Sequence, residues 1–146
     1  MTLEFVLDLK GWTGGEPQAV GEGYNWIYKG NYYCILYTRA GMYRGNHTHP
    51  NDQCTLLLDG KGKYIFKVKG EEVPHHLKIG ETLKIPSGVP HILLSDEDCL
   101  TVEWWDGLYE SDEIPVFPHY AKEMEKRVEE HEKRVEELKR DVKLKK

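Results

Sequence analysis

The sequence predicts an all-β fold of the sandwich or barrel type, followed by one C-terminal α-helix. Short segments rich in β-branched and aromatic residues recur along the chain, and glycines and prolines separate them at close intervals. The last segment contains no glycine or proline and has a seven-residue repeat. In a chain of 146 residues we therefore expect a β-barrel with an N-terminal strand arm over residues 1–118 and a charged amphipathic helix over 119–146.

The expected strands are short and bounded by turn residues. Six glycines and one proline lie within residues 1–30. They predict that residues 1–32 form an arm of short strands. Turns such as Asp59-Gly60, Lys69-Gly70 and Ser87-Gly88 punctuate the sequence that follows. The predicted strands of the barrel cover residues 33–39, 53–58, 64–69, 76–79, 81–85 and 100–105.

The C-terminal segment has the pattern of a coiled-coil helix. The sequence of residues 125–131 recurs in residues 132–138 with one substitution, and apolar residues alternate at three- and four-residue steps. The residues of this seam are Ala121, Met124, Val128, His131, Val135, Leu138 and Val142. Two arrangements fit this pattern: helix-mediated pairing in a homodimer, and docking of the helix on its own barrel.

Composition and charge exclude several classes of partner. The net charge is −5 and no Lys/Arg stripe alternates with aromatic residues, so we do not expect nucleic-acid binding. No apolar stretch approaches the ~20 residues that span a bilayer, and acidic residues stand near the N-terminus where a signal peptide carries bases. We expect a cytoplasmic protein without a membrane partner that binds a small-molecule substrate or ligand.

Cysteine and glutamine usage adds two expectations. Cys34, Cys54 and Cys99 are odd in number and far apart, which is typical of small buried strand residues in a reducing compartment. Lysine and glutamate are abundant whereas glutamine occurs only twice, and this composition is typical of heat-adapted proteins.

Two clusters of residues predict a metal site. The first reads Gly41-x5-His47-x-His49-x3-Gln53-x6-Gly60, and the second reads Gly80-x5-Pro86-x-Gly88-x2-His91-x3-Ser95. A His-x-His pair on a strand directs both imidazoles to one face, and Gln53 keeps the same parity. Three neutral imidazoles and an amide oxygen make a suitable set of ligands for a divalent metal.

These clusters resemble the two sequence motifs of the cupin superfamily. All the glycines, the proline and the three histidines match at the family's spacing, whereas Gln53 replaces the usual Glu and Ser95 the usual Asn. The resemblance implies a double-stranded β-helix, or jelly-roll barrel, with one metal ion inside one end. It implies no single reaction, because cupins include dioxygenases, isomerases, lyases and non-catalytic sugar-binding proteins.

The glutamine predicts the kind of chemistry. With His47, His49, Gln53 and His91 as ligands, all four are neutral and the ion keeps its full charge, which favours polarisation of a substrate carbonyl or carboxylate. Zinc, manganese, nickel and iron each suit such a mixed set of nitrogen and oxygen ligands. Cupins that resemble this chain at the glutamine position include lyase- or isomerase-like enzymes of unsaturated sugar acids and aromatic polyketide cyclases.

Residues near the predicted site are candidates for catalysis and substrate binding. Strand parity with His47 predicts that Tyr43 faces the interior, and Trp104 or Trp105 is a candidate wall residue, of which we favour Trp104. Arg39 and Arg44 flank the first motif and are candidates to bind an anionic substrate, although exposed loop positions are the commoner outcome for arginine. Glu103 is a candidate general acid or base if it points inward; we favour the alternative that Val102 and Trp104 face the core and Glu103 faces solvent.

Three functions follow as hypotheses. The first is a Lewis-acid enzyme of the isomerase or lyase kind that acts on a sugar acid or keto acid. The second is a metal-dependent dioxygenase. The third is a non-catalytic ligand-binding or sensor protein whose C-terminal helix contacts a partner.

Overall fold

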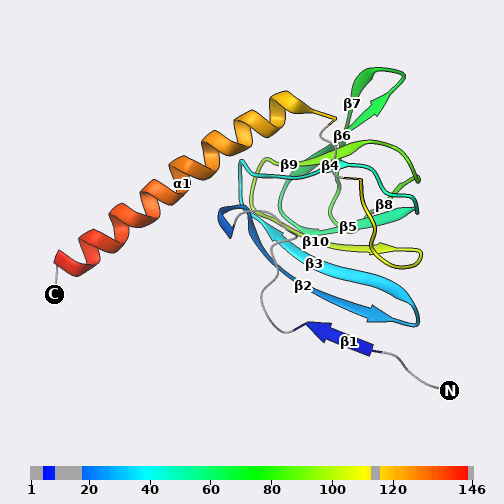
Figure 1. Ribbon diagram of the computed structural model, residues 1–146, viewed down its shortest axis with the longest axis horizontal. Helices are drawn as coiled ribbons and strands as arrows, with labels where there is room; N and C mark the ends of the chain where they lie inside the picture. The colour runs from blue at the N-terminus through cyan, green and yellow to red at the C-terminus, as the bar shows by residue number, and fades with distance from the viewer. Residues whose placement is uncertain (1–4, 9–17, 113–115, 145–146) are drawn as a thin grey trace.

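The computed structural model describes residues 5–8, 18–112 and 116–144, which form two antiparallel sheets and a C-terminal helix (Figure 1). One sheet has the strand order β1-β2-β3-β10-β5-β8 and the other has the order β4-β9-β6-β7. The element bounds are β1 Phe5–Asp8, η1 Gln18–Val20, β2 Gly21–Tyr28, β3 Asn31–Thr38, β4 Tyr43–His47, β5 Gln53–Asp59, β6 Gly62–Val68, β7 Glu71–His76, β8 Thr82–Ile85, β9 His91–Ser95, β10 Cys99–Trp105 and α1 Pro118–Leu144. This is the predicted jelly-roll barrel with a C-terminal helix.

The centre of the larger sheet alternates between buried and half-buried residues. In β10, Thr101, Glu103 and Trp105 are buried while the residues between them are half-buried. Because β10 pairs with β3 on one side and β5 on the other, Glu103 lies between Cys34 and Thr55. The period of two thus places one acidic side chain on the interior face.

A β-bulge in β4 changes the parity of that strand. Gly45 pairs with Ile92 and His47 pairs with His91, so Asn46 is the extra residue between them. Gly45 and Asn46 have positive φ angles of 96° and 70°, a conformation that glycine and asparagine adopt at low cost. As a result Arg44 and His47 line the same interior cavity although they are three positions apart.

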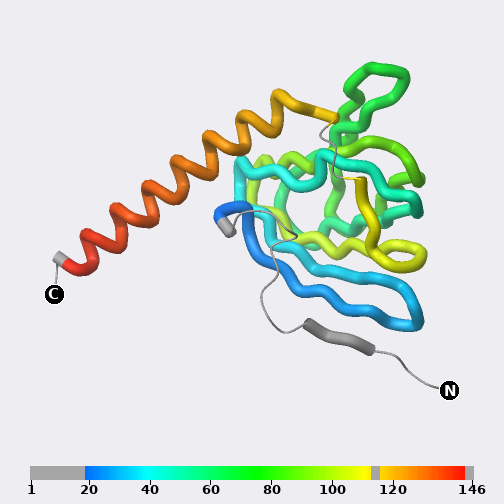
Figure 2. The backbone as a smooth tube through the Cα atoms, viewed as in Figure 1, coloured from blue at the N-terminus to red at the C-terminus, as the bar shows by residue number. Residues whose placement is uncertain are grey.

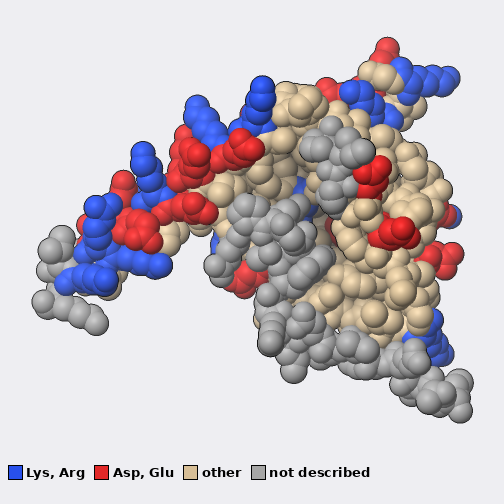
Figure 3. Space-filling view, in the orientation of Figure 1, with Lys and Arg blue, Asp and Glu red and all other residues tan. Residues whose placement is uncertain are grey.

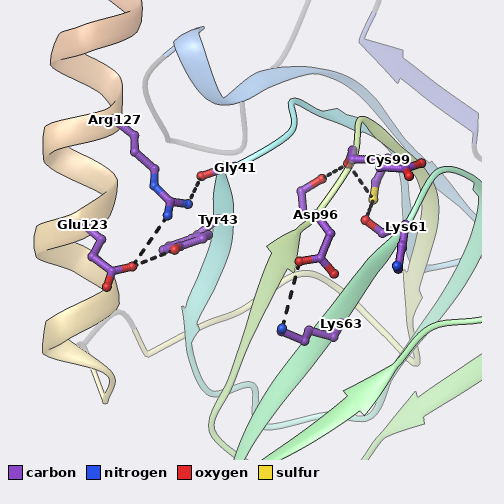
Figure 4. A network of polar contacts seen from close by, with 10 residues as sticks. Gly41, Tyr43, Lys61, Lys63, Asp96, Cys99, Glu123 and Arg127 are labelled. Atoms are coloured by element: carbon purple, nitrogen blue, oxygen red, sulfur yellow. Dashed lines mark hydrogen bonds and ion pairs between the residues drawn. The ribbon is translucent and has the colours of Figure 1, made fainter.

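The first half of α1 docks on the barrel beside β4. Phe117 is fully buried among Tyr43, Ile65, Ile92 and Leu94, and Val128 packs with Ala19, Val20 and Met42. Figure 4 shows two polar contacts across this interface: Tyr43 donates to Glu123 at 2.7 Å and Arg127 donates to the Gly41 carbonyl at 2.5 Å. The second half projects away from the barrel (Figures 1 and 2).

Some predicted strands differ from those observed. Residues 77–80 form a loop rather than a strand, and the residues before them form β7. All six residues of β7 are exposed and one is Pro74, features that suit an edge strand but weaken the sequence signal. In the predicted arm, β2 is a regular eight-residue strand; residues 9–17 lie outside the described residues.

None of the helices in the described part of the chain is long and apolar enough to cross a membrane.

Candidate metal centre

Three histidines meet at one end of the barrel. His47 ends β4, His49 follows it after one residue, and His91 begins β9 directly opposite His47 in the sheet register. One ligand nitrogen from each ring lies within 4.8 Å of the others, and the ring centroids are 4.4 to 5.1 Å apart. Histidine nitrogens bind zinc at about 2.0–2.1 Å, so a small inward shift brings all three to one ion.

Backbone carbonyls orient two of these rings. The Nδ1 atom of His49 lies 2.8 Å from the Glu110 oxygen, and that of His91 lies 2.9 Å from the Val89 oxygen. A carbonyl only accepts hydrogen bonds, so both Nδ1 atoms carry the proton and both Nε2 atoms present a lone pair. This arrangement is typical of histidines that bind a metal through Nε2.

His47 is held in the neutral form that metal binding requires. Burial and, to a smaller extent, the neighbouring His49 together lower the pKa of His47 to about 3. At neutral pH no proton has to leave this ring before an ion binds.

Gln53 is the candidate for a fourth ligand, and like the three imidazoles it is neutral. It begins β5 and is almost fully buried, and its Nε2 donates to Thr55 at 2.9 Å and to the Tyr64 hydroxyl at 3.3 Å. Its buried Oε1 has no hydrogen-bond partner among the residues that the structure describes. Gln53 lines the same cavity as His47 and His91, so this oxygen suits a bound cation. The donor set therefore fits a divalent metal.

A buried carboxyl group lies behind the ligands. Glu103 accepts hydrogen bonds from Tyr64 at 3.1 Å and from the Cys34 thiol at 3.9 Å. Burial raises the pKa of Glu103, while Tyr64 and Arg44 act in the opposite direction. The favoured prediction that Glu103 faces solvent is wrong, because the core face of β10 carries residues 101, 103 and 105 rather than 102 and 104.

The same alternation decides between the two candidate tryptophans, in favour of Trp105 and against Trp104. Trp104 is half-buried on the opposite face of β10 and does not line the cavity. Trp105 is 3% exposed, and its ring centroid lies 5.3 Å from that of His49 and 5.1 Å from that of Tyr109. The rings of Trp105 and Tyr109 therefore pack beside His49.

The two arginine candidates differ in position. Arg44 is buried and lines the cavity, where its Nε donates to Thr38 at 2.8 Å and an Nη atom to the Tyr37 carbonyl at 3.0 Å. Arg39 lies outside the cavity and stacks over the Tyr37 ring at 5.5 Å. The expectation of an exposed loop position is thus wrong for Arg44.

Tyr43 is directed away from the site, contrary to the parity prediction. Its hydroxyl donates to Glu123 of α1, and burial together with this contact raises its pKa to about 12. The bulge at Asn46 is the physical reason, because one extra residue reverses which side chains of β4 face inward. Tyr43 thus belongs to the helix interface.

The cavity between these residues is small. Its volume is about 40 Å³, whereas a single water needs roughly 10–15 Å³ on this measure. Tyr64 and Tyr109 line it but were not singled out as site residues. The strand parity of Tyr64 within residues 64–69 was a usable signal, whereas Tyr109 lies in an irregular segment without any pattern.

Ser95, the second departure from the motif, has a structural role. Its hydroxyl donates to the Glu97 carbonyl at 2.5 Å and to the Thr38 carbonyl at 3.2 Å, and its own carbonyl accepts from Gly41. It therefore connects the end of β9 to the end of β3 and to the neighbouring loops, and it does not line the cavity.

A jelly-roll barrel that gathers three histidines and a glutamine from two such motifs is the arrangement of the cupin superfamily, which this chain resembles in fold and in motif. No protein-family model matches the sequence. The chain is 27% identical over 79 residues to acireductone dioxygenase from Sulfurihydrogenibium sp. (strain YO3AOP1), a match that covers 49% of this chain and 44% of that protein.

Two kinds of solved structure share the fold. An oxalate decarboxylase from Bacillus subtilis superposes with a TM-score of 0.60 at 14% identity, over 68% of this chain and 29% of the other. The capsular polysaccharide assembling protein CapF from Staphylococcus aureus superposes with a TM-score of 0.58 at 20% identity, over 80% of this chain and 32% of the other. The chain thus spans less than half the length of each of these relatives.

Proposed function

We propose that this protein is a metal-dependent enzyme that acts on a small oxygenated anion, such as a keto acid or sugar acid, by carbonyl polarisation and proton transfer. The observation that carries the proposal is one interior cavity lined by neutral metal ligands, a buried cation and a buried acid. The cavity volume of about 40 Å³ favours the smaller members of this substrate class.

His47, His49, Gln53 and His91 would hold one divalent ion per chain, which we expect to be zinc, manganese, nickel or iron. Bacillus subtilis oxalate decarboxylase, one of the structural neighbours, has Mn(II) centres. When bound, the ion supplies Lewis acidity to a substrate oxygen. Four neutral ligands leave its charge undiminished, which favours an anionic substrate.

Arg44 and Glu103 have different roles in the proposed reaction. The guanidinium of Arg44 lines the cavity and two of its donors are fixed by the barrel, so it presents a positioned positive charge to a substrate carboxylate. Glu103 has a raised pKa and a hydrogen bond from Tyr64, and these properties suit a group that accepts and returns a proton. Trp105 and Tyr109 limit the entry of water beside His49.

A carbon–deuterium exchange assay tests the proposal without knowledge of the product. Protein with its metal content measured by elemental analysis is incubated in D2O with a panel of 2-keto and 2-hydroxy acids, and NMR follows exchange next to the carbonyl. We expect exchange that disappears in His91→Ala together with the metal, and in Glu103→Gln with the metal retained. His76→Ala, an exposed histidine, is the matched control. Metal-loaded protein that neither exchanges nor binds any of these acids would refute the proposal.

A second candidate is a metal-dependent dioxygenase, which the match to acireductone dioxygenase favours. Three neutral histidines are compatible with iron, so the ligand set permits this reaction. Oxygen uptake by Fe(II)-loaded protein in the presence of substrate distinguishes it from the first. Binding without either reaction would indicate a sensor.

We also infer a reducing, cytoplasmic environment from the cysteines. Cys34, Cys54 and Cys99 are free thiols, and Cys34 and Cys99 are buried. Disulfides form and persist in oxidising compartments, whereas isolated thiols in strands are ordinary in reducing ones.

A further inference from the structure

The projecting half of α1 carries an apolar seam that the described part of the barrel leaves exposed. Val128 is 9% exposed where the helix meets the barrel, whereas Leu138 is 51% and Val142 61% exposed farther along. A shallow groove on this half is lined by Val135, Leu138, Lys139, Val142 and Lys143. Exposed apolar residues that follow a heptad seam mark a surface for another helix.

The repeat of the sequence extends this seam along the projecting half. In heptad notation Val128, Val135 and Val142 occupy position a, and His131 and Leu138 occupy position d. The two halves of the helix thus have the same pattern but different surroundings, since only the first is docked (Figure 1). Docking also holds the helix in place, which reduces the entropy that a second helix has to offset on binding.

We propose that a second copy of this chain covers the seam, with the two helices antiparallel about a two-fold axis between Val135 and Leu138. In this register Val135 packs against the partner's Leu138, and His131 packs against the partner's Val142. The symmetry repeats each contact, as a closed two-fold interface requires.

The charges that flank the seam select this direction. Antiparallel pairing sets Glu132 opposite the partner's Lys139, and Arg134 opposite the partner's Asp141. All four side chains are exposed, and acids and bases follow one another closely along the side of the helix that is visible in Figure 3. Opposite charges therefore meet at every flanking pair of this register.

The parallel alternative is electrostatically inferior. It sets Arg134 opposite the partner's Lys139, which places two like charges beside the exposed half of the seam. One of its favourable pairs, Arg127 with the partner's Glu132, competes with the hydrogen bond of Arg127 to the Gly41 carbonyl. The overlap spans few heptads, so we expect a reversible dimer that dissociates on dilution and weakens with added salt.

Sedimentation of the full chain over a range of concentrations, at low salt, tests the proposal. Lys139→Glu sets two carboxylates opposite each other in the antiparallel dimer and should weaken association at least tenfold, whereas it would strengthen a parallel dimer. Glu132→Lys combined with Lys139→Glu should restore the original affinity to within about twofold. Leu138→Asp should abolish the dimer. Lys133→Glu, on the outer face of the helix, is the matched control.

Circular dichroism and metal content verify that each variant remains folded. A monomer at all concentrations would overturn the proposal. Tighter association of Lys139→Glu would overturn the antiparallel direction, and a Leu138→Asp variant that dimerises like the parent would overturn the role of the helix.

Discussion

Gln53 determines the charge of the proposed metal centre. In Gln53→Glu a carboxylate would replace the amide, so we expect the ion to remain bound while affinity for a small carboxylic acid falls at least tenfold. The physical reason is the loss of one net positive charge, which at about 4 Å and an effective dielectric constant of about 20 is worth about 4 kcal/mol before screening. Isothermal titration calorimetry of the metal-loaded protein measures the effect.

Asp52→Asn, an exposed neighbour of Gln53, is a suitable control because it changes charge without reaching the cavity. Equal anion affinity in the parent and in Gln53→Glu would contradict this account of the glutamine.

We expect Glu103 to make the stability of the metal-free protein depend on pH. Its pKa is raised in the folded state, so the folded state retains a proton that the unfolded state releases as the pH rises past about 4.3. The contribution of Glu103 to stability, measured as the difference between the parent and Glu103→Gln, should fall with rising pH in that window by about 1.4 kcal/mol for each pKa unit of the shift, whereas His47 contributes in the opposite direction. Glu103→Gln removes this slope and should be more stable than the parent at neutral pH. Urea unfolding at pH 4 and pH 7 checks the sign.

At the scale of single residues, spacing succeeded where simple alternation failed. The motifs identified the residues that the barrel brings together, because a His-x-His pair needs only a local extended conformation. The direction of the Tyr43 side chain depends on the bulge in β4. The direction of the Glu103 side chain depends on which face of β10 is buried, and both faces of this strand carry apolar residues. Neither is encoded in a short stretch of sequence.

The bulge also anchors the helix through Asn46. The Asn46 side chain donates to the Phe117 carbonyl and accepts from the amides of Val116 and Phe117, at 2.7 to 3.1 Å. Asn46→Ala should cost about 2–4 kcal/mol, since each hydrogen bond contributes roughly 0.5–1.5 kcal/mol. Urea unfolding measures this loss. Asn46→Gly should lose the same bonds but tolerate the positive φ, so a near-neutral glycine variant would show that backbone strain, not the anchor, dominates.

At the scale of elements, the helix was the easiest part of the chain to predict and its docking was the hardest. The segment without glycine or proline predicts residues 119–146, and α1 covers Pro118–Leu144. A proline at the first helical position is a common start signal. The heptad pattern could not show that the helix leaves the barrel after Val128. The point where it leaves depends on the positions of η1 and β4.

For the whole molecule, bound metal should raise thermal stability. A free ion concentration a hundredfold above the dissociation constant stabilises the folded state by about 2.7 kcal/mol, and about 2–4 °C per kcal/mol is typical of this size. We therefore expect a chelator to lower the melting temperature by about 5–10 °C. Differential scanning fluorimetry should show no such shift in His91→Ala, and a full shift in His76→Ala.

The jelly-roll topology could not be predicted from the pattern of strands and turns alone. Short strands and glycine stops indicate an all-β protein, but the order β3-β10-β5 in one sheet depends on pairings between residues far apart in the chain. The family resemblance provided that order. It provided no substrate, because one scaffold supports many reactions.

Asn46 also joins the candidate metal site to the C-terminal helix. It is the immediate neighbour of His47 and the clamp on the start of α1, a helix of 27 residues that is about 40 Å long at 1.5 Å per residue. Because Val128 is docked on the barrel, only the part of α1 beyond it acts as a lever arm: a rotation of about 5° there displaces the end of this segment, about 24 Å long, by about 2 Å. A spectroscopic label near residue 140 would thus magnify shifts at His47 that are too small to follow directly.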